Sequence, residues 1–155
     1  MKVHLIAVGR LRAGPERVMV DDYLQRFDRT GRPLGLGPVI EHEVEDKKNL
    51  GMGAEAELIA RALPSGAALV TLDERGKLMT SPDFAALLAR YRDAGREVAF
   101  VIGGADGIDP GLRARADASV SFGAMVWPHM LVRVMLAEQL YRAATILGGG
   151  PYHRA

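Results

Sequence analysis

The feature that most constrains the fold is a regular alternation between short apolar segments and longer segments with helical periodicity. The apolar segments are rich in β-branched residues and end at Gly, Pro or charged turns, which is typical of buried strands. Strands are expected at Lys2–Gly9, Val39–Val44, Ala67–Leu72, Glu97–Ile102 and Ala118–Phe122. Strands that alternate with helices form a mostly parallel sheet with helices on both faces. The sequence therefore predicts an α/β fold.

Five helices are expected between and after these strands. They begin near Pro15, Met52, Ser81, Pro110 and Pro128. Ser81 is expected to cap its helix, with Pro82 at the first helical position. The charged stretch Asp73–Gly76 is expected to form a turn. No internal repeat or domain boundary is visible, so residues 1–155 are expected to form a single domain.

The last expected helix, from Pro128 to about Leu147, is apolar around much of its circumference. Its apolar residues are Leu131, Val132, Val134, Met135, Leu136, Ala137, Leu140, Tyr141, Ile146 and Leu147. A helix of this kind has to be buried on several sides. In a chain of 155 residues a second copy is one ready source of cover, so we expect a homodimer that packs through this helix.

Composition excludes several classes of function. The chain has no cysteine, which rules out disulfides, thiolate metal sites and a cysteine nucleophile. The four histidines are too scattered for a metal-ligand motif. No signal peptide or membrane span is recognisable, so a cytoplasmic protein without a membrane partner is expected. The net charge of +1 means that any contact with nucleic acid has to be local or built from two chains.

Three segments are candidates for ligand binding at one edge of the sheet. Phe100–Gly107 is a strand followed by a glycine-rich turn, which either admits a nucleotide-like ligand or is simply a tight turn. Leu72–Lys77 leaves another strand at the same edge. Phe122–His129 has small and apolar residues that suit a flat ligand, although packing alone would also explain them. Neither the dinucleotide fingerprint nor a Walker motif is present.

Polar residues concentrate near the C-terminus. Glu138 and Arg142 stand four apart on the last helix, either as a surface ion pair or as partly buried groups with a function. The tail Gly148–Ala155 would ordinarily be frayed. It nevertheless carries a phenol, an imidazole and a guanidinium, which can stack on a base and bind phosphate. From residue 128 onward, the chain contains three arginines and one glutamate, so this region has an excess of basic residues.

In this order, the segments LVTLDERGK (Leu69–Lys77), FVIGGADG (Phe100–Gly107) and Pro128–Arg154 resemble the SPOUT, or trefoil-knot, class of methyltransferases. The resemblance is to its small enzymes that methylate N3 of a pseudouridine in 23S ribosomal RNA. It covers essentially the whole chain. The first 65 residues match mainly in the opening strand and the general layout. The resemblance implies a C-terminal trefoil knot, S-adenosylmethionine as methyl donor, no metal, and a homodimer whose active sites draw on both chains. It implies the ribosome as partner.

Carried over residue by residue, the resemblance implies two sets of site residues. The donor contacts fall on Leu72, Gly103, Gly104, Phe122, Gly123, Ala124, Met125, Val126 and Trp127. A polar pair common in this loop of the family is replaced here by Gly123 and Val126. The catalytic candidates are His129, Glu138 and His153 for proton acceptance, Arg142 and Arg154 for phosphate or developing charge, and Tyr152 for stacking.

Two other classes of function remain open from sequence alone. The first is a noncatalytic module that binds ribosomes or RNA and keeps a vestigial nucleotide pocket. The second is a nicotinamide or flavin oxidoreductase on an open α/β sheet, which the missing dinucleotide fingerprint disfavours.

Overall fold

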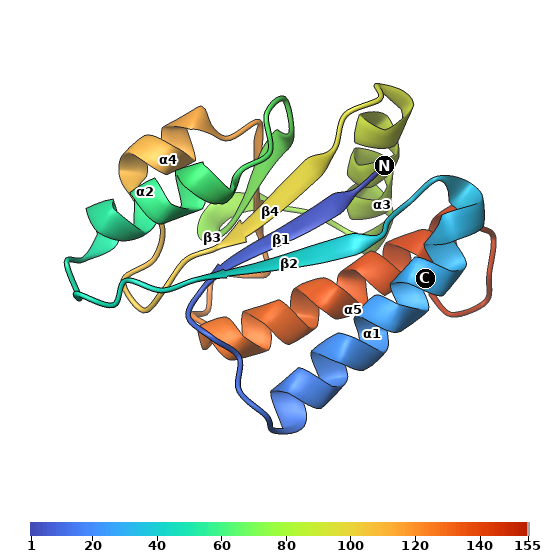
Figure 1. Ribbon diagram of the computed structural model, residues 1–155. Helices are drawn as coiled ribbons and strands as arrows, with labels where there is room; N and C mark the ends of the chain where they lie inside the picture. Colours follow the sequence, from blue (N-terminus) through green and yellow to red (C-terminus); the bar gives the residue numbers. More distant parts are fainter. Residues whose placement is uncertain (155) are drawn as a thin grey trace.

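A computed structural model, which describes residues 1–154, contains a five-stranded sheet in the order β2-β1-β4-β3-β5. All four strand pairs are parallel. The strands are β1 (Val3–Val8), β2 (Val39–Val44), β3 (Ala68–Leu78), β4 (Val98–Ile102) and β5 (Ala118–Ser121). The prediction of an α/β fold with a parallel sheet is thereby confirmed, and the sheet is the middle layer in Figure 1.

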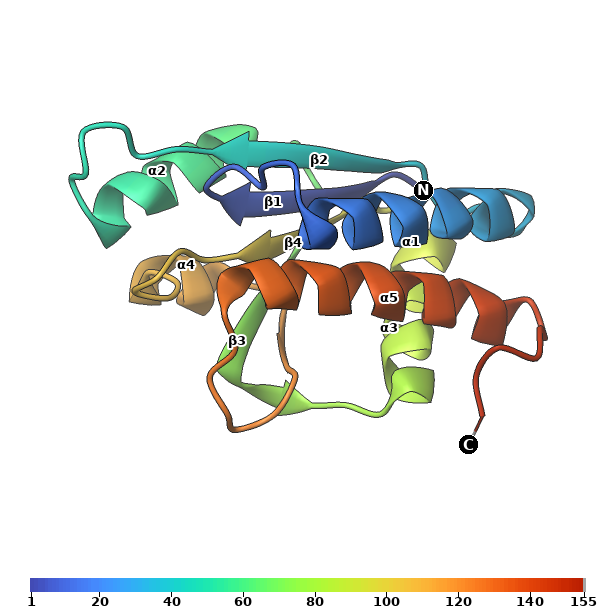
Figure 2. The same cartoon turned by 90° about the horizontal axis from the view of Figure 1, so that it is seen from below.

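Helices cover both faces of the sheet (Figures 1 and 2). The helices are α1 (Pro15–Gly31), α2 (Met52–Ala62), α3 (Ser81–Asp93), α4 (Pro110–Arg115) and α5 (His129–Leu147), with a short 3-10 turn, η1, at Arg32–Leu34. One core cluster joins the sheet to α1, α3 and α5. A smaller one joins it to α2 and α4. Alternate residues of β1 serve the two clusters, and every residue of this strand is buried, as a parallel sheet covered on both faces requires.

Helix α5 lies beside α1 on the same face of the sheet, as Figure 2 shows, and also packs on α3. Leu136, Ala137 and Leu140 are fully buried within the single chain. The predicted burial of this helix on several sides is therefore confirmed, but its own chain provides most of the cover. Met130 and Leu131, near the start of the helix, are 40% and 41% exposed. The homodimer stays a prediction that concerns this exposed part.

Two local predictions were wrong. Thr80, not Ser81, caps α3, because its backbone is extended and its hydroxyl accepts a hydrogen bond from the Asp83 amide at 3.2 Å. The expected turn at Asp73–Gly76 lies within β3, whose register against β5 shifts between Leu72 and Lys77. The chain forms a bulge there rather than reversing direction. The trefoil knot implied by the resemblance stays a prediction.

A buried arginine fastens α5 to the sheet. Arg133 is 1% exposed, and its guanidinium donates to the Glu43 carboxylate on β2 and, at 3.1 Å, to the carbonyl of Gly9 just after β1. Glu43 also accepts from the Leu11 amide at 2.6 Å and pairs with Arg17 of α1 at 3.3 Å. Burial acts to raise the pKa of Glu43, but the hydrogen bonds from Leu11 and Arg133 outweigh it, so this pKa lies below its ordinary value.

The pair predicts an asymmetric effect of mutation. Glu43→Gln leaves Arg133 as a buried charge without a counter-ion and should destabilise the fold by about 3–5 kcal/mol. Arg133→Met leaves Glu43 partly solvated and still bonded to Leu11 and Arg17, so it should cost only about 1–2 kcal/mol. Urea unfolding at one fixed protein concentration measures both changes. Equal losses, or a larger loss for Arg133→Met, would contradict this view of the pair.

Candidate functional site

A cavity of about 850 Å³ opens at the carboxyl end of the sheet, a volume typical of small-molecule sites. Its walls are the segments that follow β3, β4 and β5, together with the start of α5. Of the predicted donor contacts, it is lined by Leu72, Gly103, Gly104, Phe122, Gly123, Met125, Val126 and Trp127. Ala124 is the predicted contact that does not line it. Three segments that are distant in the sequence thus meet at one edge, as expected, while their contacts with a ligand stay predictions.

The glycine turn after β4 is shaped by its own packing. A Cβ atom on Gly103 would lie 2.6 Å from the carbonyl oxygen of Gly107, and one on Gly104 would lie 2.9 Å from a carboxylate oxygen of Glu55 on α2. Packing within the chain is therefore enough to explain why Gly103 has no side chain, and this feature is not by itself evidence for a ligand. Burial, followed by the nearby charges of Asp46 and Asp106, raises the pKa of Glu55.

The loop after β5 presents an apolar surface that is held by one hydroxyl. Met125, Val126 and Trp127 are 73%, 79% and 41% exposed. The Ser121 hydroxyl accepts from the Gly123 amide at 3.0 Å and lies 3.1 Å from the Glu74 carbonyl, to which it can donate. Sequence reasoning did not single out Ser121. Its position directly before the loop was the available signal. The loop can cover a flat ligand with apolar side chains while its backbone is fixed from below.

His129 connects this cavity to α5. It is the first residue of the helix and lines the cavity. Burial, followed by the nearby Arg133 guanidinium, lowers its pKa below the ordinary histidine value. The imidazole is therefore neutral at pH 7 and is able to accept a proton there.

The other polar candidates form a separate cluster farther along α5. Glu138 accepts from Arg142 Nε at 2.9 Å and from the Tyr152 hydroxyl at 3.0 Å. Nη1 of Arg142 lies 3.2 Å from Nδ1 of His153, and the guanidinium stacks over the Tyr152 ring at 4.8 Å. The tail is thus folded against its own helix instead of frayed. Arg154 is exposed and makes no hydrogen bond or ion pair within residues 1–154.

The environment of Tyr152 fixes its protonation state. Burial and the hydrogen bond to Glu138 raise the pKa of Tyr152 to about 12. The phenol is therefore a hydrogen-bond donor at neutral pH and is unsuited to accept a proton. Of the predicted tail residues, Tyr152 and His153 are brought to Glu138 and Arg142, whereas Arg154 is not.

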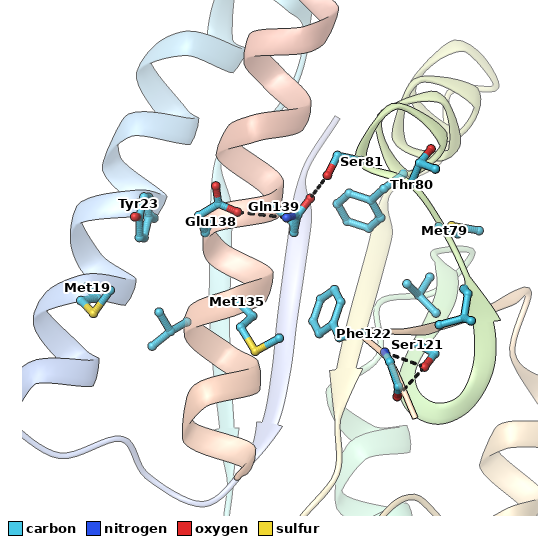
Figure 3. Close-up of a pocket in the computed structure, with 15 residues that line it drawn as sticks. Met19, Tyr23, Met79, Thr80, Ser81, Ser121, Phe122, Met135, Glu138 and Gln139 are labelled. Carbon is cyan, nitrogen blue, oxygen red and sulfur yellow. Dashed lines mark hydrogen bonds between the residues drawn. The ribbon is translucent and has the colours of Figure 1, made fainter. Parts of the chain in front are cut away.

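A second cavity of about 480 Å³ lies between α1, α3 and α5, and sequence reasoning missed it. Glu138 and Gln139 face it from α5, and Tyr23 faces it from α1 (Figure 3). It shares Phe122, among other residues, with the larger cavity, so the loop after β5 separates the two spaces. No sequence signal marks this cavity, because its walls come from four segments that each have an ordinary apolar pattern.

The two candidate groups are far apart within one chain. A helix rises about 1.5 Å per residue, so Glu138 lies about 14 Å along the axis from His129, and Arg142 lies about 20 Å from it. Glu138 faces the second cavity, and neither it nor Arg142 lines the larger one, so His129 and the Glu138 cluster are not gathered around one space within residues 1–154.

Two further observations concern metal ligands and membrane-spanning helices. His4 and His42, which are distant in the sequence, lie 3.1 Å apart, and His4 is 3.0 Å from Glu97. Even so, within residues 1–154 no group of three or more potential ligands is arranged to hold a metal ion. Over the same residues, no helix has the length and apolar character needed to cross a membrane.

Comparison with known proteins gives consistent relatives. Residues 1–153 match the family described as "Predicted SPOUT methyltransferase". The chain is 72% identical to the Ribosomal RNA large subunit methyltransferase H of Ruegeria sp. (strain TM1040) over 155 residues. It is 73% identical to the protein of the same name from Ruegeria pomeroyi. Each comparison covers 99% of both chains.

Solved structures share the fold at low sequence identity. A probable methylase family protein from Haemophilus influenzae has a TM-score of 0.55 at 12% identity, covering 99% of this chain and 70% of that one. TrmJ from Z. mobilis has a TM-score of 0.54 at 11% identity, covering 99% and 73%. These likenesses support the fold alone.

Because Trp127 lines the larger cavity, we expect ligand binding there to change tryptophan fluorescence. Trp127 is the single tryptophan of the chain and lines this cavity while 41% exposed. A ligand that fills the cavity should shield the indole, so saturating S-adenosylmethionine should shift tryptophan emission to shorter wavelength without RNA present. Trp127→Phe serves as the blank, and NAD⁺ should give no saturable change. An emission spectrum that S-adenosylmethionine leaves unchanged, while calorimetry records binding, would move the site elsewhere.

Proposed function

The chain belongs to the SPOUT methyltransferase family, and we propose that it transfers a methyl group from S-adenosylmethionine to N3 of a pseudouridine in large-subunit ribosomal RNA. The observation that carries the proposal is the cavity at the sheet edge, in which eight of the nine expected donor contacts meet. Relatives at 72% and 73% identity that are named as ribosomal RNA large subunit methyltransferases support the substrate class. Ribosomes as substrate imply a cytoplasmic location.

The residues of the cavity fit this donor. Its walls combine apolar side chains, such as Phe122 and Trp127, with polar groups, among them Asp73 and Arg113. When bound, S-adenosylmethionine supplies a methyl group on a sulfonium, which is already a good leaving group. The apolar loop suits a flat adenine ring, and the backbone of the glycine turn suits its polar edge. No metal is required for such a transfer.

The reaction forms a bond between N3 and the methyl carbon, breaks the bond between that carbon and sulfur, and leaves its electron pair on sulfur. The N3 proton has to pass to a base, and the protein has to align the reacting atoms. His129 is neutral at pH 7, and Glu138 and His153 are the other candidate acceptors. Tyr152 remains protonated and can orient the base, while Arg142 and Arg154 can bind phosphate or charge developing on the uracil ring.

We propose further that a complete active site needs two copies of the chain. An in-line displacement brings its reacting atoms to about 3–3.5 Å. In one chain, Glu138 faces the second cavity and does not line the larger one, which we propose holds the donor and call the donor cavity. A second copy would bring its own tail to that cavity. The exposed apolar residues Met130 and Leu131 on α5, with Val18 and Met19 on α1, supply a surface for such a homodimer.

The test is methyl transfer to ribosomes that lack the modification. With labelled S-adenosylmethionine, label should appear in 23S RNA, and nucleoside analysis should recover it as N3-methylpseudouridine. The same assay with naked RNA and with separated ribosomal subunits identifies which form is the substrate. Arg142→Gln should lower the single-turnover rate by about 100-fold, because a charged group near the reacting ring is lost. Arg29→Gln, an exposed arginine on α1, is the matched control.

Two outcomes would contradict the proposal. Donor binding and ribosome binding without label in RNA would favour a noncatalytic binding module. Label at another base or at a ribose would refute the assignment of N3.

A further inference from the structure

Two charged residues in the wall of the donor cavity are incompletely satisfied. Asp73 follows the buried part of β3, and its side chain is only 8% exposed. Arg113 reaches toward it from α4, but Nε lies 3.7 Å from the nearer Asp73 oxygen, too far for a hydrogen bond. This Nε atom is buried and has no hydrogen-bond partner within residues 1–154. The other Asp73 oxygen accepts from the Arg75 amide at 2.8 Å.

This pair differs from the other charged residues that line the cavity. Glu74, Arg75 and Asp106, which also line the cavity, are exposed to solvent and need no partner. Nε of the buried Arg133 also lacks a partner within residues 1–154, but the other two nitrogens of that guanidinium donate to Glu43 and to the Gly9 carbonyl. The Arg113 side chain is 26% exposed, but burying its Nε atom and the Asp73 carboxylate with unused hydrogen-bonding capacity is unfavourable. A ligand that bonds to both groups would offset that cost.

We propose that Asp73 and Arg113 bind the amino-acid end of the methyl donor, with the guanidinium on its α-carboxylate and the Asp73 carboxylate on its α-ammonium. This assignment rests on the proposed function. The methionine end of the donor is a zwitterion, and the pair offers one group of each opposite charge in the same wall. The ribose diol is a poorer match, because it carries no charge and therefore offers no anionic acceptor to the Arg113 guanidinium.

The assignment is tested by comparing ligands that differ only in this end. S-adenosylhomocysteine keeps the α-amino carboxylate, whereas methylthioadenosine has the same adenosine and a sulfur without the amino acid. Calorimetry at fixed salt gives the affinity of both for the full-length chain and for Arg113→Gln and Asp73→Asn. Arg115→Gln changes an exposed arginine of the same helix and is the matched control. Thermal unfolding of each variant reports on the fold.

Arg113→Gln and Asp73→Asn should each lower the affinity for S-adenosylhomocysteine by about 10-fold to 100-fold, which corresponds to the loss of one charge-assisted contact. The affinity for methylthioadenosine should stay within about twofold of the unmodified chain's. Arg113→Lys should restore part of the affinity, since it keeps the charge. Equal weakening of both ligands, or no change in either, would overturn the assignment while leaving the donor cavity intact. An unmodified chain that binds neither ligand would refute the proposed function itself and this assignment with it.

Discussion

The arrangement of the molecule depends on how α5 is fixed to the sheet, and the buried Arg133–Glu43 pair fixes it. A guanidinium that is 1% exposed needs a counter-charge and hydrogen-bond acceptors, which Glu43 and the Gly9 carbonyl provide. Its partners lie at the carboxyl ends of β1 and β2, so the N-terminal part of α5 is held at the edge where the larger cavity opens. His129 stands one turn earlier, and its low pKa follows in part from the same guanidinium.

Once α5 is fixed there, the larger cavity and the polar cluster around Glu138 lie at different positions along this helix. The larger cavity lies at the beginning of α5, and the Glu138 cluster with the folded tail lies along its second half. The tail is held by Tyr152 and His153, which contact Glu138 and Arg142.

Much of this could be predicted from sequence. Strand and helix positions follow from local periodicity, and parallel strands necessarily bring the segments after β3, β4 and β5 to one edge. The roles of Arg133 and Arg113 could not be predicted from sequence, because they depend on partners far away in the chain: Glu43 is 90 positions from Arg133. In sequence, Arg133 contributed only to a count of basic residues. The bulge at 73–76 and the second cavity also depend on packing between distant segments, which no local pattern reports.

The central claim is that a donor cavity from one chain works with the tail of another. It is tested most directly by purified mixed dimers, made by co-expression with two different tags. One chain is stopped after Gly150, and the other carries Gly103→Val, which displaces the glycine turn of the donor cavity. Each variant alone should be inactive in single-turnover methylation of ribosomes. The mixed dimer should recover about half of the normal rate, because one of its two symmetric sites then has an intact cavity and an intact tail. A mixed dimer as inactive as its parents would show that cavity and tail must belong to the same chain.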